Sequence, residues 1–182
     1  MNFKIISKND LIPSIWEGGK TYEYFISPTD SNYSNRDFDF RISSASIEKS
    51  PSNFTRFESY QRYLVMLDAD LKINRNGKEE NYAQLEIFDF DSNDEIQSFS
   101  IGNDFNLMVR KSGNPFEIIV QMLNDIYKNP WMFVFAIEET KIILNEKEIR
   151  LNANDLLVLE NDRIESISIE SNQEVIFGRL KR

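Results

Sequence analysis

The sequence contains no histidine and no cysteine among its 182 residues. Without cysteine the chain has no disulfide framework, and nothing in it indicates an oxidising compartment. Zinc sites built from cysteine or histidine are excluded, as are a Ser-His-Asp triad, a cysteine nucleophile and a histidine general base. Any chemistry must therefore come from carboxylates, lysine, arginine, tyrosine, serine or threonine.

Long apolar runs are also missing. The longest apolar stretches fall far short of the ~18 residues that a membrane-spanning helix needs, and the opening MNFKIISKND lacks the apolar centre of a signal peptide. Glycine and proline occur six and five times, too rarely for a low-complexity chain. These absences predict a folded, soluble, cytoplasmic protein.

Basic residues are outnumbered by acidic ones. The sequence has 21 lysines and arginines against 30 aspartates and glutamates, which gives a formal net charge of −9. An acidic surface repels phosphate backbones and anionic lipid, so we expect neither nucleic acid nor a membrane as a partner. The simplest interpretation of the excess charge is solubility.

The sequence does have enough apolar and aromatic residues for a core. Hydrophobic residues make up 41% of the chain and aromatic residues 13%, with 14 Phe and 7 Tyr. Aromatic residues favour strands over helices. The length allows one large domain or two small fused domains, because domains typically run ~100–200 residues. A chain of this size buries roughly 70% of its unfolded surface, so its core needs no disulfide or metal.

Alternating apolar and polar side chains, the pattern of half-buried strands, recur along the chain, for example in residues 38–42. The pair Asn76-Gly77 predicts a hairpin, because both residues tolerate the positive φ of a type I′ turn. Residues 145–148 lie between two short apolar runs and predict a second hairpin. Isoleucines, Val and Phe between residues 164 and 177 predict the closing strands.

One segment fits two patterns. The apolar residues that follow Pro115 up to Tyr127 have helical spacing, whereas residues 116–123 also alternate as in a strand. Periodicity alone does not separate these possibilities, and both remain open at this point.

The sequence also contains a weak internal repeat. Residues 64–71 resemble residues 134–141, and each copy continues into a hairpin and then into a further apolar strand, at 85–88 and 156–159. The repeat predicts duplicated β units. Many short strands without intervening helices favour a barrel or a sandwich.

Four ordered blocks resemble the HutD/Ves family, a cupin-type group named for histidine-utilisation and stress-induced proteins. Residues 16–23 (WEGGKTYE) resemble the family's Trp-x-Gly-Gly-x-Thr-x-Glu opening, and residues 36–45 (RDFDFRISSA) its Asp-Phe-x-Trp/Phe-Arg-Ile-Ser-x-Ala block. Residues 54–62 (FTRFESYQR) resemble its Phe-Ser/Thr-x-Phe…Gly-x-x-Arg segment, and residues 104–108 (DFNLM) its Asp-Phe-Asn-x-Met block. The remainder of the chain matches with weaker identity.

The resemblance implies an all-β, cupin-like (RmlC-like) bicupin: two packed β-barrels in one chain. The first barrel is expected mainly at about 15–110 and the second mainly at about 111–182, with termini that can cross between the barrels. It also favours the strand interpretation of residues 116–123. For function it implies a small-molecule-binding, regulatory role, with formylglutamate, an intermediate of histidine breakdown, as the ligand proposed for HutD.

The sequence departs from the family pattern at two places. The opening block is shorter than in some members and lacks their Asn, and Ala69 stands where many members carry Gly. The ligand therefore need not be shared with those members.

Alternation assigns polar side chains of all four blocks to single strand faces. A barrel brings such faces together around its interior. The candidate ligand-binding residues are Trp16, Thr21, Glu23, Arg41, Ser43, Arg62, Asp104 and Asn106.

Arg41 and Arg62 are the central candidates, because a guanidinium holds a carboxylate through two parallel hydrogen bonds. Uncharged neighbours would add hydrogen bonds, so the set suits a small acid that carries an amide. The alternative is that the charges neutralise one another inside the protein, Arg41 with Glu23 and Arg62 with Asp104, since a buried pair needs no ligand.

Three hypotheses for function follow. The first is a non-catalytic module, monomeric or homodimeric, that binds a small acidic, formylglutamate-like metabolite and uses no cofactor, metal or catalytic residue. The second is a cupin-type enzyme with a histidine-free site, for instance a hard cation held by Glu23, Asp104 and Asn106. The third is a protein-interaction module.

Overall fold

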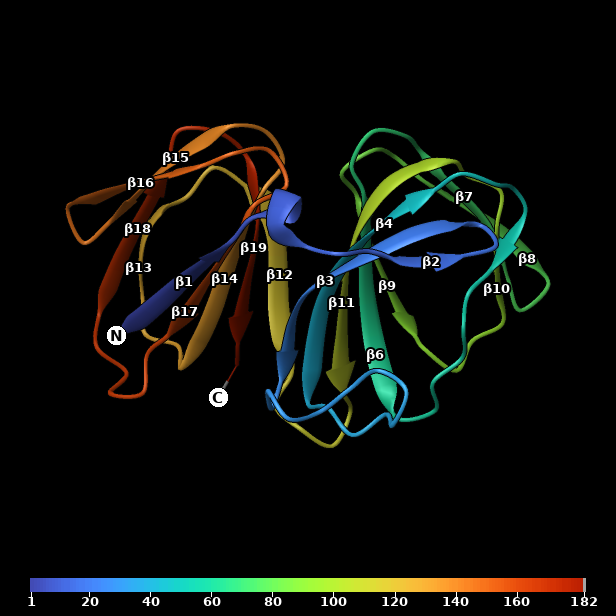
Figure 1. The fold of residues 1–182 in the computed structure, drawn as a ribbon, viewed down its shortest axis with the longest axis horizontal. Helices are drawn as coiled ribbons and strands as arrows, with labels where there is room; N and C mark the ends of the chain where they lie inside the picture. Colours follow the sequence, from blue (N-terminus) through green and yellow to red (C-terminus); the bar gives the residue numbers. More distant parts are fainter. Residues whose placement is uncertain (182) are drawn as a thin grey trace. The chain divides into compact units, whose positions relative to one another are not determined.

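The computed structural model describes residues 1–181 as an all-β chain, as the alternation predicts. Within these residues there are nineteen strands and one short 3-10 turn, Lys8–Asp10 (Figure 1). The chain divides into two compact units. Unit 1 comprises residues 1–10 and 114–181, and unit 2 comprises residues 11–113.

Unit 2 contains a six-stranded and a four-stranded antiparallel sheet. The strand order of the six-stranded sheet is β2 (Ser14–Trp16), β3 (Gly19–Ser27), β4 (Phe40–Ile47), β11 (Gly102–Arg110), β6 (Tyr60–Met66) and β9 (Ile87–Asp91). The order of the four-stranded sheet is β5 (Ser52–Asn53), β10 (Ile96–Ser98), β7 (Leu71–Arg75) and β8 (Lys78–Tyr82).

Unit 1 contains a five-stranded and a four-stranded antiparallel sheet. The strand order of the five-stranded sheet is β1 (Asn2–Ile6), β17 (Leu156–Glu160), β14 (Trp131–Ala136), β19 (Val175–Leu180) and β12 (Phe116–Gln121). The order of the four-stranded sheet is β13 (Asn124–Tyr127), β18 (Ile167–Ser171), β15 (Thr140–Leu144) and β16 (Lys147–Leu151).

The sheets do not close into barrels, which corrects one part of the expected architecture. In the described part of the chain, each unit has two separate hydrogen-bonded sheets, and each sheet ends in edge strands. The two sheets of a unit are joined instead by apolar side chains. Leu64 and Phe88 of the six-stranded sheet share one buried cluster with Ile73 and Ile96 of the four-stranded sheet.

The two units repeat one strand order. The series β4-β11-β6-β9 in unit 2 corresponds to β12-β19-β14-β17 in unit 1, and β5-β10-β7-β8 corresponds to β13-β18-β15-β16. The sequence repeat lies on equivalent elements, since residues 64–71 run from β6 into β7 and residues 134–141 run from β14 into β15. Strands β2 and β3 extend the sheet of unit 2, and β1 extends the sheet of unit 1 at its other edge.

Both hairpins predicted from the sequence are confirmed. Asn76 and Gly77 connect β7 to β8 with φ of 51° and 88°, the positive values that a type I′ turn needs. The second hairpin connects β15 to β16, where Asn145 and Glu146 have φ of 46° and 69°. The turn is therefore two residues long, and the predicted loop 145–148 also includes the start of β16.

The ambiguous segment after Pro115 is extended. It forms β12, which pairs with β19, and then β13, which pairs with β18. The helical spacing of its apolar residues reflects burial of some side chains from two consecutive strands and from the turn between them. Phe116, Leu123 and Tyr127 are buried, while Ile126 is exposed.

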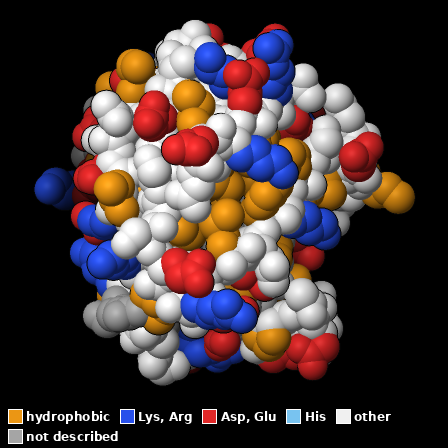
Figure 2. Space-filling model, turned by 90° about the vertical axis from the view of Figure 1, so that its left-hand side faces the viewer, with side chains coloured by type: hydrophobic (Ala, Val, Ile, Leu, Met, Phe, Trp, Pro, Cys, Tyr) orange, Lys and Arg blue, Asp and Glu red, His pale blue; other side chains and the backbone are white. Residues whose placement is uncertain are grey.

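Charged side chains of both signs are interspersed over the face drawn in Figure 2, and apolar side chains gather near its centre. Among residues 1–181, no helix is long and apolar enough to cross a membrane.

Candidate functional site

Unit 2 contains a pocket of about 410 Å³. Its floor is the polar part of the inner face of the six-stranded sheet, next to the apolar part that packs on the four-stranded sheet. All eight candidate residues predicted from the sequence line this one pocket: Trp16, Thr21, Glu23, Arg41, Ser43, Arg62, Asp104 and Asn106.

The strand register explains why these residues meet. Ser43 of β4 pairs with Glu23 of β3 on one side and with Asn106 of β11 on the other. Arg41, two residues before Ser43 and on the same face, pairs with Met108 of β11. Because side chains at alternate positions of neighbouring strands share a face, these registers stack the polar residues in rows across the sheet.

Arg41 is held by three partners. Its Nε donates to Glu23 Oε2 at 2.6 Å, and its Nη1 donates to Ser43 Oγ at 3.1 Å. Its Cζ lies 4.4 Å from the ring centroid of Tyr33, a cation–π distance. The side chain of Glu23 is itself partly exposed, while Arg41 as a whole is only 8% exposed. The ion pair considered from the sequence for these two residues is therefore present.

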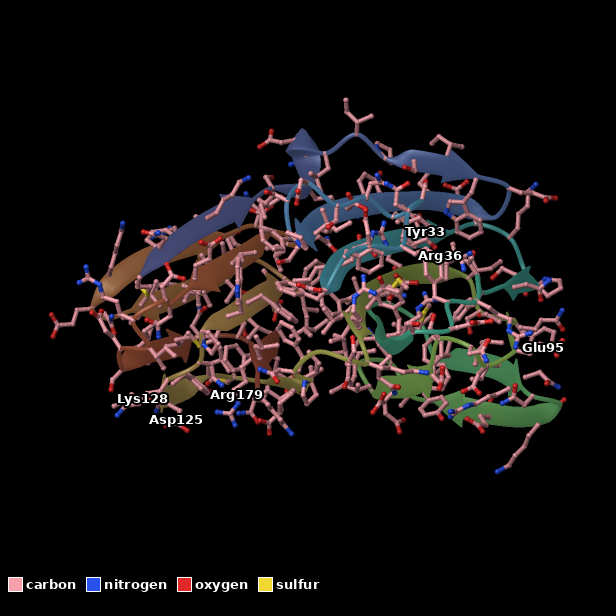
Figure 3. The ribbon with its side chains drawn as sticks, turned by 90° about the horizontal axis from the view of Figure 1, so that it is seen from below. Tyr33, Arg36, Glu95, Asp125, Lys128 and Arg179 are labelled. Carbon is pink, nitrogen blue, oxygen red and sulfur yellow. The ribbon has the colours of Figure 1, made fainter. Side chains whose placement is uncertain are left out.

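Tyr33 comes from the loop between β3 and β4, which the side-chain view labels together with Arg36 (Figure 3). Its ring packs on Phe57, with 5.0 Å between the ring centroids. The Tyr60 hydroxyl holds this loop, because it lies 2.8 Å from the backbone carbonyl oxygens of both Arg36 and Phe38 and shares its one proton between them. Tyr33, which lines the pocket, therefore lies on a loop that the Tyr60 hydroxyl holds in place.

Arg62 of β6 has fewer polar partners than Arg41. Its Cζ lies 5.3 Å from the ring centroid of Phe54 and 5.2 Å from that of Phe90, and its Nη1 lies 3.4 Å from the Thr55 carbonyl oxygen. Its Nε is buried and has no hydrogen-bond partner among the described residues. Desolvation by burial lowers the pKa of this guanidinium.

Asp104 of β11 lies at the other end of the polar floor and is 4% exposed. Its Oδ1 accepts a hydrogen bond of 2.9 Å from the backbone N–H of Ala45. Desolvation raises the pKa of its carboxyl group to about 6, although that hydrogen bond and the charge of Arg62 both act to lower it. Asp104 and Arg62 are therefore electrostatically coupled, but they do not form the direct ion pair considered from the sequence.

Asn106 lies between these two charges on the pocket floor. It is 7% exposed, and its Oδ1 has no hydrogen-bond partner within residues 1–181. Ser52 Oγ, from the facing strand β5, is also buried without a partner. Buried polar atoms are nearly always hydrogen-bonded, so such atoms around one pocket indicate a polar occupant, either a ligand or water.

Trp16 forms part of the rim. Its Nε1–H donates to Thr21 Oγ1 at 3.1 Å, so these two candidate residues bind each other across the β2–β3 hairpin. The indole ring lies over Gly18, where an added Cβ would be 2.0 Å from a ring carbon. Gly18, the first glycine of the Gly18-Gly19 pair, therefore leaves the space that the Trp16 ring occupies.

Sequence reasoning missed several pocket residues. Tyr33, Phe54 and Thr55 lie on loops, and Ser52 lies on a strand of two residues. Strand alternation cannot place such residues. Phe54 lies in the aromatic block 54–62, where the sequence favours a place in the core.

The hard-cation set considered from the sequence, Glu23, Asp104 and Asn106, lies along the same pocket. Across residues 1–181, no group of three or more acidic side chains could hold a metal ion. Glu23 is bound to Arg41, and Asp104 to the Ala45 backbone.

Comparisons with known proteins agree with this architecture. A family model described as HutD matches residues 8–177. The structure of HutD from Pseudomonas fluorescens SBW25 is similar with a TM-score of 0.82 and 18% identity, over 99% of this chain and 98% of that chain. A conserved protein of unknown function from Pseudomonas aeruginosa PAO1 is similar with a TM-score of 0.85 and 20% identity, over 100% of both chains.

The fold extends to cupins. A cupin 2 conserved barrel domain protein from Leptotrichia buccalis is similar with a TM-score of 0.62 and 13% identity, over 98% of this chain and 96% of that chain. The comparison with curated proteins finds no match.

Proposed function

The chain belongs to the HutD family, and from that membership and the pocket of unit 2 we propose that it is a non-catalytic, regulatory protein of the cytoplasm that binds a small acidic metabolite. The ligand would resemble formylglutamate, with one or more carboxylates and an amide-like group. Unit 2 would hold it in the pocket that Arg41 and Arg62 line.

The observation that carries the proposal is the gathering of partnerless polar atoms in one pocket. Arg62 Nε offers a donor, and Asn106 Oδ1 offers an acceptor. A guanidinium beside a cavity suits a carboxylate, and a carboxamide oxygen suits an N–H group. The pocket volume of about 410 Å³ is also within the range of small-molecule sites.

The architectural part of the proposal is a bicupin. Each unit would be one cupin-type element, related to the other by duplication. The strand order that the units share and the likeness to cupin structures support this interpretation.

A thermal-shift titration tests the binding role. The intact chain is heated with N-formylglutamate, urocanate or glutamate at millimolar concentration, and at least one of these acids should raise the melting temperature. No stabilisation by any of them would contradict the proposal. If one acid binds, Arg62→Ala should reduce its affinity at least tenfold, because the carboxylate loses its charge-assisted hydrogen bonds.

Arg150→Ala is the matched control for that substitution. Arg150 lies on β16 in unit 1 with an exposed side chain, so its removal should leave both the folding and the thermal shift unchanged. Equal loss of binding in the two variants would show that the effect is not specific to the pocket.

The non-catalytic part is tested separately. N-formylglutamate incubated with the protein at micromolar concentration should be recovered intact, as followed by proton NMR of the formyl group. Conversion of more than one equivalent of N-formylglutamate per protein chain would show that the protein is an enzyme.

A further inference from the structure

The two arginines of the pocket differ in their freedom to bind an anion. Arg41 already has a carboxylate at 2.6 Å, a hydroxyl at 3.1 Å and an aromatic ring on its face. A ligand carboxylate at Arg41 would have to compete with Glu23 for its positive charge. Arg62 has no carboxylate within ion-pair distance in the described part of the chain, and its buried Nε lacks an acceptor. The first anionic group of a ligand therefore belongs at Arg62.

Two acceptor oxygens on the pocket floor receive no hydrogen bond there from the described residues. Asn106 Oδ1 is buried without a donor, and Asp104 uses Oδ1 for the Ala45 backbone. The second oxygen of Asp104 receives no hydrogen bond from residues 1–181. Both oxygens accept from N–H or O–H groups, and the charged Asp104 carboxylate repels a second carboxylate that approaches it.

The charges of the pocket balance. Arg41 and Arg62 carry two positive charges, and Glu23 and Asp104 carry two negative charges once the pH is above the pKa of Asp104, which is about 6. A ligand with one carboxylate at Arg62 leaves a small excess of negative charge. A second carboxylate would be desolvated beside two acidic groups with no free cation, which is costly in a partly buried site.

We propose that Glu23 and Asp104 make this pocket selective for acids with a single carboxylate and an N–H donor at the opposite end, so that amides of dicarboxylic acids bind better than the dicarboxylates themselves. The inference deepens the binding role proposed above and depends on it. It adds a charge rule: Arg62 anchors the carboxylate, while Asn106 and Asp104 accept from the donor.

The test compares two ligands that differ at one group. N-formylglutamate has two carboxylates, and N-formylglutamine has the same skeleton with the side-chain carboxylate replaced by a primary amide. Calorimetric titration of the intact chain at pH 7.5 should give a dissociation constant at least tenfold lower for N-formylglutamine. Equal affinity, or tighter binding of N-formylglutamate, would overturn the charge rule and leave the binding role standing.

Absence of binding by both compounds, together with no effect of urocanate or glutamate, would overturn the binding role itself. The two failures are therefore distinguishable in one set of titrations.

Glu23→Gln adds a second readout. The substitution releases Arg41 from its carboxylate partner, so the affinity for N-formylglutamate should rise at least fivefold and the preference for the amide should shrink. The matched control is Glu48→Gln, which breaks an exposed 3.6 Å ion pair with Lys20 outside the pocket. An unchanged preference in Glu23→Gln, or the same change in Glu48→Gln, would contradict the proposal.

Discussion

Residues of the same type have different roles in the pocket because their local surroundings differ. Arg41 and Arg62 have the same chemistry, but Glu23 neutralises the first. Arg62 contacts two aromatic rings and the Thr55 carbonyl oxygen and has no carboxylate within ion-pair distance among residues 1–181. The acidic residues differ as well. Glu23 is partly exposed, whereas Asp104 is buried and ionises reluctantly. Exposure and partners, rather than residue type, determine which charge is available.

Asp104→Asn should stabilise the unliganded protein at neutral pH. The pKa of Asp104 is raised from its ordinary value of 3.8 to about 6, so the folded state binds more protons than the unfolded state between these pH values. Stability that depends on this group is therefore greatest at low pH and is lost as the pH rises through 6. Asparagine should be more stabilising at pH 7.5 than at pH 4.5 by about 2 kcal/mol.

Urea denaturation at the two pH values measures this difference. Asp39→Asn is the control, because its side chain is mostly exposed and lies 3.6 Å from Arg110. A stability gain from Asp104→Asn that does not change with pH would show that desolvation of the carboxylate is not its cause.

The family blocks, together with alternation along their strands, predicted which side chains share the pocket face. The rows from Thr21 to Asp104 also need the antiparallel registers of β3, β4 and β11. The partners of each charge could not be predicted in this way. The choice of Glu23 for Arg41, and of the Ala45 backbone for Asp104, depends on register and on side-chain reach. Tyr33 lies on a loop, where side chains do not follow the alternation of a strand.

Among the elements, the hairpins were the most predictable because their turns are decided by two adjacent residues. Asn76-Gly77 needs positive φ at both positions, and few residue pairs tolerate that conformation. The segment that forms β12 and β13 was not predictable from spacing. Its strand character comes from pairing with β19 and β18, which follow it by about fifty residues.

Gly77→Ala should destabilise unit 2 through the backbone alone. An added Cβ at Gly77 meets no atom within 4 Å, so no steric clash contributes, but the residue has a φ of +88°. Alanine in this region costs roughly 1 kcal/mol relative to glycine. Chemical denaturation should show that loss with an unchanged denaturant dependence.

Gly113→Ala is the comparison within the same unit. Its Cβ would be 3.5 Å from the Arg110 carbonyl oxygen, an ordinary contact, and the residue lies outside the positive-φ region. This substitution should be neutral or stabilising by up to about 1 kcal/mol, because it restricts only the unfolded chain. If the two alanines had equal effects, the turn conformation would not be the cause.

At the scale of the whole molecule, the chain repeats one strand order but does not divide at one point. Residues 1–10 belong to unit 1, residues 11–113 form unit 2, and the chain then returns to unit 1. The sequence repeat indicated the duplication. The family resemblance allowed the termini to cross between the units, but it did not give the partner of the N-terminal strand, because β1 pairs with β17, at least 150 residues away.

The packing inside each unit explains why its sheets do not close into a barrel. Apolar side chains on the facing sheets fill the interior of each unit, so the sheets are held by packing, and hydrogen bonds around a closed ring are not required. Unit 1 has a large apolar cluster between its sheets. Unit 2 divides its interior into apolar clusters and the polar pocket.

Deletion of residues 1–7 should therefore weaken unit 1 and spare unit 2. The deletion removes all five β1 pairs with β17, the buried Ile6, and Phe3, which packs against the unit 1 core. The newly exposed edge of β17 should lose hydrogen-exchange protection. The free energy of unfolding of unit 1 should fall by about 2–4 kcal/mol, as it does when large core side chains are deleted. The pocket strands of unit 2 should keep their protection, because no residue of β1 belongs to their sheet.

Ile5→Ser is the matched variant for this deletion, since it removes an exposed apolar side chain but keeps the β1 backbone. Its exchange pattern should equal that of the parent chain when peptides from both units are followed by mass spectrometry. Loss of protection in β4 and β11 as large as in β17 would mean that the two units unfold together. Loss confined to unit 1 would show that unit 2, which contains the pocket, stays folded when unit 1 is destabilised.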